Sequence, residues 1–235
     1  MKEQILPLHP IATVTTDFPV KFGIPRQSGL AATRGYLRFL PEFRSPEAVR
    51  GLEGYSHVWL IWGFSECPTG KWSPTVRPPR LGGNRRIGVF ATRSPFRPNP
   101  LGLSSARLAE ILYDEKDGPV LVLEGLDLMS GTPVYDIKPY LPFTDSHPDA
   151  LGGFADEVKE NGLTVRFPDA VRECLPSDLL LPLEQVLSGD PRPHYQDDPL
   201  RVYGFPFAGY EIRFRVESDV LTVESTTKLE AESHE

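Results

Sequence analysis

The chain has 235 residues, of which 40% are hydrophobic and 24% charged, and its net charge is −7. This composition indicates a globular protein with one good core and a smaller second unit, and it excludes a membrane helix because no apolar run approaches about 20 residues. The first ten residues contain charges, a histidine and two prolines, so we expect no signal peptide and a cytoplasmic location.

Short strands are expected along the first part of the chain, because its 25 prolines interrupt helices. Only Pro46–Gly51 indicates a helical turn, with proline at its start and glycine at its end. Apolar runs bounded by turn residues predict strands at Ile11–Thr15, Tyr55–Phe64, Arg86–Thr92, Leu103–Ile111, Val120–Leu126 and Val134–Tyr140. Because Tyr55–Phe64 is apolar on both faces, we expect it to be a central strand. Several short strands with little helical periodicity favour a closed or nearly closed β-barrel.

A second unit is predicted after a composition shift near Asp145–Pro148. The acidic, glycine-containing segment Leu151–Asn161 is interpreted as a linker. Leucines and valines at helical spacing predict a helix over Ser177–Ser188, stopped by Gly189. Alternating strands are expected at Gly209–Glu217 and Val220–Thr226, joined as a hairpin through Ser218–Asp219. The predicted fold is therefore mainly β, with a barrel domain at 1–148 and a small α+β domain at 149–235.

The positive charge is concentrated in one segment. Between Cys67 and Ala109 there are eight basic residues and no acidic one: Lys71, Arg77, Arg80, Arg85, Arg86, Arg93, Arg97 and Arg107. Such separation of charge predicts an anionic partner that is contacted locally. The alternative is a basic patch that pairs with acids elsewhere in the fold. Arginine predominates over lysine, which favours forked contacts with phosphates or stacking on bases.

Common catalytic motifs are absent. No Gly-x-Gly-x-x-Gly follows a strand, no phosphate-binding loop ends in Gly-Lys-Ser/Thr, and no Gly-x-Ser-x-Gly is present. Two cysteines are too few for a zinc site or a disulfide framework, and the five histidines lack metal-ligand spacing, so no metal is expected. Motif searching alone therefore leaves an enzymatic function undecided.

Three segments instead join a predicted strand to a turn locked by proline or glycine, where rigid scaffolds present functional groups. They contain the motifs PRQSGL, RPPRLGGN, ATRSPFRPNPLG, LDL followed by GTP, and DIKPYLPF. In this order the motifs resemble the TsaA-like family, and in particular its bacterial branch of tRNA methyltransferases. The resemblance covers about Ile11 to Phe143, and the run Asp190–Tyr195 is similar to the C-terminal segment of the family.

The resemblance implies a β-barrel methyltransferase with S-adenosylmethionine as the methyl donor. It also implies a homodimer with donor sites near the subunit interface. The implied substrate is the threonylcarbamoyl-modified adenosine 3′ of the anticodon, at position 37, which is methylated on N6 in threonine-accepting tRNA. Two alternatives stay open: an RNA-binding barrel without enzymatic activity, and a methyltransferase that acts on another substrate.

Carried over by position, the resemblance implies a donor site made of residues from five segments. The expected donor-binding residues are Pro25, Arg26, Gln27, Ser65, Glu66, Arg93, Leu103, Asp127, Leu128, Met129 and Ser130. One departure concerns Ser130, because some relatives carry aspartate before Gly-Thr-Pro. The change is harmless if this position acts through its backbone, whereas donor contacts differ if it acts through a carboxylate.

The remaining candidates concern catalysis and RNA. Methyl transfer needs alignment of two ligands, and a base would help because the target nitrogen carries an acidic proton. Asp136 is the candidate base or orienting group and Lys138 its electrostatic partner, although a local ion pair between them is an equal alternative. Asn99 precedes a proline and is a further catalytic candidate, although an Asn-Pro pair is usually a turn. The expected RNA contacts are Arg77, Arg80, Arg86, Arg97 and Arg107. Phe96 is a candidate for stacking on a base, although burial is the more common fate of a phenylalanine.

Overall fold

The protein contains a closed β-barrel and a second unit of one sheet and one long helix. The computed structural model describes residues 6–66, 72–78, 85–114, 116–157, 162–192 and 198–230. The barrel has the strand order β1-β2-β7-β6-β3-β8, which confirms the predicted barrel. Its strands are β1 Ala12–Thr16, β2 Arg34–Phe39, β3 His57–Gly63, β6 Leu101–Asp114, β7 Gly118–Glu124 and β8 Pro133–Pro139.

The barrel is filled by alternate residues of these strands. Its core includes Val14, Leu37, Leu60, Leu121 and Leu123, each at most 1% exposed. The outer face of β3 is also partly covered, because the Trp59 indole donates a hydrogen bond to Asp145 at 2.9 Å and packs against Tyr140. This cover explains why β3 is apolar on both faces, as expected of a central strand.

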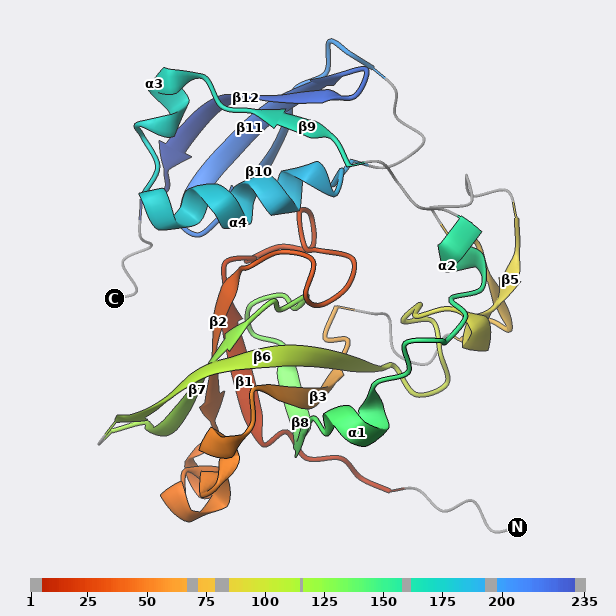
Figure 1. Cartoon of the computed structure of the whole chain (residues 1–235), viewed down its shortest axis with the longest axis vertical. Helices are drawn as coiled ribbons and strands as arrows, with labels where there is room; N and C mark the ends of the chain where they lie inside the picture. The colour runs from red at the N-terminus through yellow and green to blue at the C-terminus, as the bar shows by residue number, and fades with distance from the viewer. Residues whose placement is uncertain are drawn as a thin grey trace.

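The second unit is a four-stranded sheet with the order β10-β11-β12-β9, packed against helix α4 (Figure 1). Helix α4 spans Ser177–Ser188 as predicted, and its Leu183 and Leu187 are fully buried. Gly189 follows the last helical residue as its C-cap, and its φ of −72° lies outside the left-handed region. The strands are β9 Thr164–Arg166, β10 Tyr203–Phe207, β11 Tyr210–Glu217 and β12 Val220–Lys228, and β11 and β12 form the predicted hairpin.

Short helical segments connect these elements. In the predicted linker, the segment Phe154–Glu157 is a helical turn. That turn is α2, and the remaining short helical segments are η1 Pro41–Phe43, η2 Pro46–Val49, η3 Leu52–Gly54, α1 Pro142–Asp145 and α3 Asp169–Arg172. No helix within the described ranges has the length and apolar character needed to span a membrane.

The prediction of a continuous strand at Arg86–Thr92 was wrong. The chain there forms the two-residue strand β5, Ile87–Gly88, which pairs with β4, Thr75–Val76, and then the 3-10 turn η5, Val89–Ala91. The hydroxyl of Thr92 donates to the Val89 carbonyl at 2.8 Å, which closes this turn. A local side-chain-to-backbone bond therefore competes with strand extension here. We call the region formed by 72–78 and 85–100 the β4–β5 lobe.

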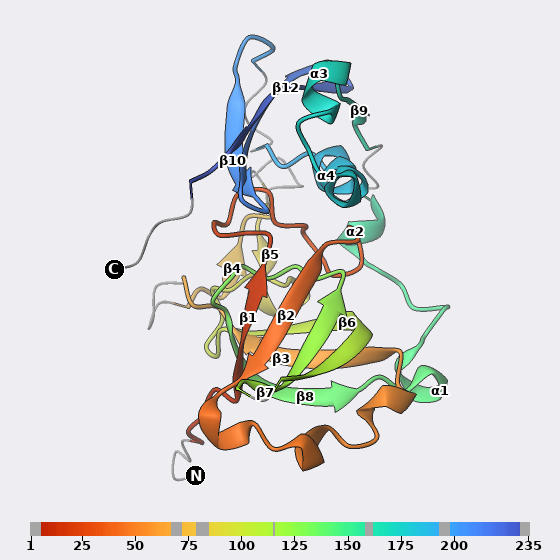
Figure 2. The same cartoon turned by 90° about the vertical axis from the view of Figure 1, so that its left-hand side faces the viewer.

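The loop between β1 and β2, residues 17–33, connects the two units. It rises from the barrel and lies under α4 and the sheet in both views (Figures 1 and 2). Phe18 is fully buried in the second core, where its ring lies 5.5 Å from that of Phe207. The backbone N–H of Ala32 also donates to the Gln185 side chain of α4 at 2.7 Å. The loop thus belongs by sequence to the barrel and by packing to the second unit.

Replacing Phe18 by alanine tests this connection. Loss of a buried aromatic side chain should lower the free energy of unfolding by about 3–5 kcal/mol. Because the loop also carries Pro25–Gln27, which the resemblance assigns to the donor site, affinity for the expected donor S-adenosylmethionine should fall as well. Leu221→Ala removes a fully buried side chain of the same core from β12. This control should lose comparable stability and keep its donor affinity, as measured by denaturant unfolding and calorimetry. Equal donor affinity in both variants would refute the role given to the loop.

Candidate functional site

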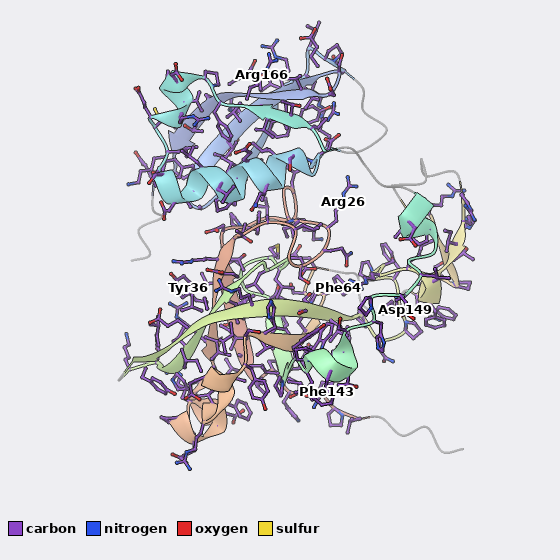
Figure 3. All side chains as sticks on the ribbon, viewed as in Figure 1. Arg26, Tyr36, Phe64, Phe143, Asp149 and Arg166 are labelled. Carbon is purple, nitrogen blue, oxygen red and sulfur yellow. The ribbon has the colours of Figure 1, made fainter. Side chains whose placement is uncertain are left out.

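Three predicted donor-binding segments meet at the end of the barrel that faces the second unit. They are the β1–β2 loop, the turn that follows η5, and residues 125–132 between β7 and β8. Figure 3 shows Arg26 between the two units, where its guanidinium donates to the Asp190 carbonyl at 3.1 Å. Gly29 donates its backbone N–H to the Gly125 carbonyl at 2.8 Å, which joins the first segment to the third.

Asp127 is held by a chain of buried hydrogen bonds. The Ser104 hydroxyl donates to Asp127 Oδ1 at 2.6 Å and accepts from the Trp62 indole N–H at 3.0 Å. Ser104 is only 2% exposed. The Trp62 ring lies so close to Gly102 that any side chain at Gly102 would collide with it. A glycine on β6 therefore lets the indole reach Ser104, and Ser104 orients the carboxylate.

Arg93 and Gln27 complete a cluster around Asp127. The Arg93 guanidinium donates to the Gln27 side-chain oxygen, which ties the turn after η5 to the β1–β2 loop. Burial raises the pKa of the Asp127 carboxyl above its ordinary value, although the Ser104 hydroxyl, backbone N–H groups and the charge of Arg93 oppose the shift. We call Gln27, Arg93, Ser104 and Asp127 the Asp127 cluster. It offers a half-buried acceptor beside a cation and an amide.

Other predicted donor residues lie around this cluster with different roles. The Lys21 ammonium donates to the Glu66 backbone carbonyl at 2.9 Å and lies 3.7 Å from its carboxylate, so it links the segment Ser65–Glu66 to the β1–β2 loop. Leu128 is a core residue of the barrel. The Met129 carbonyl accepts from the Thr132 hydroxyl at 2.7 Å, which closes the turn before β8. Pro25, in the β1–β2 loop, is half-buried.

Ser130 lies at a separate cleft between the barrel and the second unit. Its backbone N–H donates to the Phe18 carbonyl at 2.8 Å, and its hydroxyl is 3.4 Å from the Thr16 N–H. The cleft has a volume of about 570 Å³ and is lined by Thr16, Asp17, Pro19, Ser130, Pro176, Asp178, Leu179, Ala208 and Gly209. Burial raises the pKa of Asp17; a hydrogen bond from the Arg34 backbone opposes the shift and the nearby Asp178 adds to it. Ser130 thus contacts the protein through its backbone and hydroxyl at this cleft.

The proposed catalytic pair lies on a different surface. Asp136 and Lys138 form an ion pair at 3.0 Å, and Asp136 also accepts the Ile137 N–H at 2.9 Å. Asp136 lies opposite Ile61 of β3, which in turn lies opposite Leu103, a residue 56% exposed on the outside of β6. Because neighbouring Ser104 points inward, Asp136 and Leu103 lie outside the barrel wall and apart from Asp127. Asn99 is exposed in the turn before β6.

The arginines expected to bind RNA fall into two groups. Arg77 and Arg86 are exposed in the β4–β5 lobe, where Arg86 donates to the Thr75 hydroxyl at 2.9 Å. Arg97 instead donates to two carbonyls of its own lobe, and Arg107 pairs with Glu124 on the barrel. Arg80 lies outside the described residues. For Arg107 the geometry therefore matches the alternative of pairing with acids in the fold.

Sequence reasoning missed Ser104 and Trp62. Trp62 lies in β3 and Ser104 in β6, two strands that were read for burial alone, and the serine at an inward position of β6 was the available signal. A buried hydroxyl needs a hydrogen-bond partner, so such a serine indicates a polar group inside the barrel end. Over the described residues, no group of three or more His, Cys, Asp or Glu side chains could hold a metal ion.

Comparison with known proteins supplies a family context. The profile of the tRNA-methyltransferase O N-terminal domain matches residues 13–146, and that of the TrmO C-terminal domain matches residues 160–229. An Escherichia coli K12 protein named tRNA (adenine(37)-N6)-methyltransferase is 42% identical over 215 residues, covering 88% of this chain and 91% of that protein. A Pseudomonas aeruginosa protein, RcsF, provisionally named an S-adenosylmethionine-dependent methyltransferase, is 45% identical and covers 84% of this chain and 87% of its own length. A crystal structure of TrmO from P. aeruginosa superposes with a TM-score of 0.77 at 34% identity, covering 97% of this chain and 99% of that one.

The raised pKa of Asp127 has a consequence for stability. A carboxyl whose folded pKa exceeds its unfolded pKa costs stability when ionised, and the cost disappears once pH falls below both values. Asp127→Asn should therefore have a higher thermal midpoint than the wild type at about pH 7, and the difference should shrink towards about pH 3. Scanning calorimetry across this range measures the effect.

Ser104→Ala is the matched variant for this titration. It removes a hydrogen bond that favours the ionised form, so the pKa of Asp127 should rise further. Nuclear magnetic resonance titration of the Asp127 carboxyl would detect the shift. An unchanged or lowered pKa in Ser104→Ala would contradict the arrangement described.

Proposed function

Because the chain belongs to the tRNA-methyltransferase O family, we propose that it transfers a methyl group from S-adenosylmethionine to N6 of adenine 37 in tRNA. The observation that carries this proposal is the Asp127 cluster, in which three predicted donor-binding side chains from separate segments meet at one end of the barrel. The finer substrate is the threonylcarbamoyl-modified adenosine of threonine-accepting tRNA, as the sequence resemblance implies.

The cluster has the polar groups that the methyl donor needs. A ribose offers hydroxyl donors, and the half-buried Asp127 carboxylate is an acceptor already oriented by Ser104. The methionine part carries a carboxylate, for which the exposed Arg93 guanidinium is a suitable partner. When bound, S-adenosylmethionine supplies an electrophilic methyl group on a sulfonium. Gln27 and the backbone of Arg26 and Pro25 would border it from the β1–β2 loop.

The chain's own task is then alignment and proton handling. The N6 lone pair of the modified adenine is delocalised into the purine and the carbamoyl group, so removal of its proton would make it a better nucleophile. We assign this role to Asp136, oriented by Lys138, whose ammonium lies 3.0 Å from the carboxylate. Asn99 remains a candidate partner for the adenine N6 group.

The proposal includes a homodimer, because Asp136 lies on the outside of the barrel and apart from the Asp127 cluster. Leu103 and Leu101 are exposed on the same wall, at 56% and 36%, and an exposed apolar pair on a barrel is a suitable interface. A partner subunit packed there would bring its own segments to this wall. We also propose a cytoplasmic location, where tRNA is available, and a division into domains between residues 148 and 149.

The methylation assay tests substrate and reaction together. Full-length protein, labelled S-adenosylmethionine and threonine tRNA are combined with or without the threonylcarbamoyl group. We expect label only on N6 of position 37, with the modified tRNA preferred by about 100-fold or more, since a polar site rejects a substrate that lacks its hydrogen-bonding group. Equal labelling of both tRNAs would exclude the modified adenosine. If calorimetry showed no donor binding, the methyltransferase itself would be excluded.

Asp136→Asn tests the base separately from the donor site. Turnover should fall by about 100-fold or more, with donor affinity unchanged. Asp149→Asn removes another exposed carboxylate, beyond β8, and should behave as the wild type in both measurements (Figure 3). Retained turnover in Asp136→Asn would remove Asp136 from the catalytic residues.

A further inference from the structure

We propose that Phe90, supported by Arg97, is a stacking platform for an unpaired base of the tRNA anticodon loop. The proposal rests on the proposed function, since it takes tRNA as the substrate. It assigns a role to Phe90, which the family resemblance did not single out, and a different role to Arg97, which was expected to contact RNA directly.

The ring of Phe90 is exposed and fixed. Phe90 lies in η5 and is 72% exposed, which is unusual for a large apolar side chain. The Arg97 guanidinium carbon lies 5.6 Å from the centroid of its ring, within the range of a cation–π contact. The exposed ring area is therefore available to a ligand while the guanidinium supports the ring.

Arg97 is itself held in place. Its guanidinium donates to the Val89 carbonyl at 3.2 Å and to the Thr92 carbonyl at 2.6 Å, on either side of Phe90 in the chain. These bonds fix the guanidinium against η5, so little conformational freedom is lost when the ring receives a partner. Arg97 is accordingly a positioning residue that acts through Phe90.

Two further aromatic side chains are exposed in the same lobe. Trp72 is 53% exposed and Phe96 is 44% exposed. The Ser73 N–H donates to the Phe96 carbonyl at 3.3 Å, and the Val89 N–H donates to the Pro74 carbonyl at 3.0 Å, so backbone bonds hold the three aromatic positions in one small structure. Its position beside the barrel is seen in Figure 1.

The charge around these rings identifies the kind of partner. Arg77, Arg86 and Arg93 are exposed in the same lobe, and neither 72–78 nor 85–100 contains an acidic residue. Arginines next to exposed aromatic rings are the groups that bind single-stranded nucleic acid, because rings stack on bases and guanidinium groups contact phosphates.

The platform adjoins the Asp127 cluster. Phe90 precedes Arg93 by three residues, and Arg93 donates to Gln27 within that cluster. A base stacked on Phe90 is thus held a short distance along the chain from the donor-binding residues. Stacking at this position would anchor the loop while the target adenine is presented for methylation.

The experiment measures the affinity of the protein for fluorescently labelled threonine tRNA at constant salt. The protein itself carries no label, and no S-adenosylmethionine is present. We compare wild type with Phe90→Ala, Phe90→Tyr and Phe90→Leu. Alanine and leucine should weaken binding by about ten- to a hundredfold, whereas tyrosine should restore it, because leucine keeps apolar volume but has no ring to stack. Phe143→Ala, which removes a side chain 87% exposed on α1, is the control and should bind as the wild type.

Light scattering and donor calorimetry on the same samples separate the explanations. Unchanged mass and donor affinity in Phe90→Ala, together with weaker RNA binding, support the platform. Wild-type affinity in Phe90→Leu, or a reduced mass in Phe90→Ala, would overturn it and assign Phe90 to an apolar contact between copies. If wild type binds tRNA through Phe90 but transfers no label, the proposed function fails while the platform stands.

Discussion

Burial of the β1–β2 loop in the second core is the constraint on which the rest of the structure depends. Phe18 and Ala31, near the two ends of this loop, are both in that core. Between them lie Gly23, which has a φ of +91° and lies against the ring of Phe205, and the segment Pro25–Gln27. Any side chain at Gly23 would meet that ring. The loop is therefore fixed from both ends, which restricts where Gln27 lies when it accepts the hydrogen bond from Arg93.

This packing gives the second unit a physical role. The barrel alone can place Asp127 and Ser104, because both lie on or next to its own strands. It cannot place the β1–β2 loop, whose apolar side chains Phe18, Phe22 and Ile24 pack against β10, α4 and their neighbours. The Asp127 cluster, which we propose as the methyl-donor site, thus depends on both units. A half-buried carboxylate is costly in such a place, and hydrogen bonds from Ser104 and backbone groups offset part of that cost.

The elements predicted from sequence succeeded where local pattern and tertiary environment agree. Helix α4 and the β11–β12 hairpin have strong periodicity and a clear stop or turn, and both were confirmed. Strand β10 was missed because Gly204 and Pro206 interrupt its pattern, although Pro206 is tolerated on an edge strand that pairs only with β11. Strand β2 was missed because it alternates over only six residues between two turn-rich segments. At Arg86–Thr92, the hydroxyl of Thr92 and the guanidinium of Arg97 stabilise a 3-10 turn that periodicity does not encode.

The sequence by itself determined the barrel class, the second α+β unit, the basic segment and the ordered motifs by which the family was identified. These depend on residue type and spacing along the chain. Only the tertiary structure decided which motif residues meet: Gln27, Arg93 and Asp127 come together, while Asp136 pairs with Lys138 on the outer wall. It also decided that Arg97 supports Phe90 and that Arg107 pairs with Glu124. The reason is that strand pairing and loop burial bring together residues that are distant in the chain, such as Gln27 and Arg93, 66 positions apart, and no local pattern specifies which partner a side chain will find.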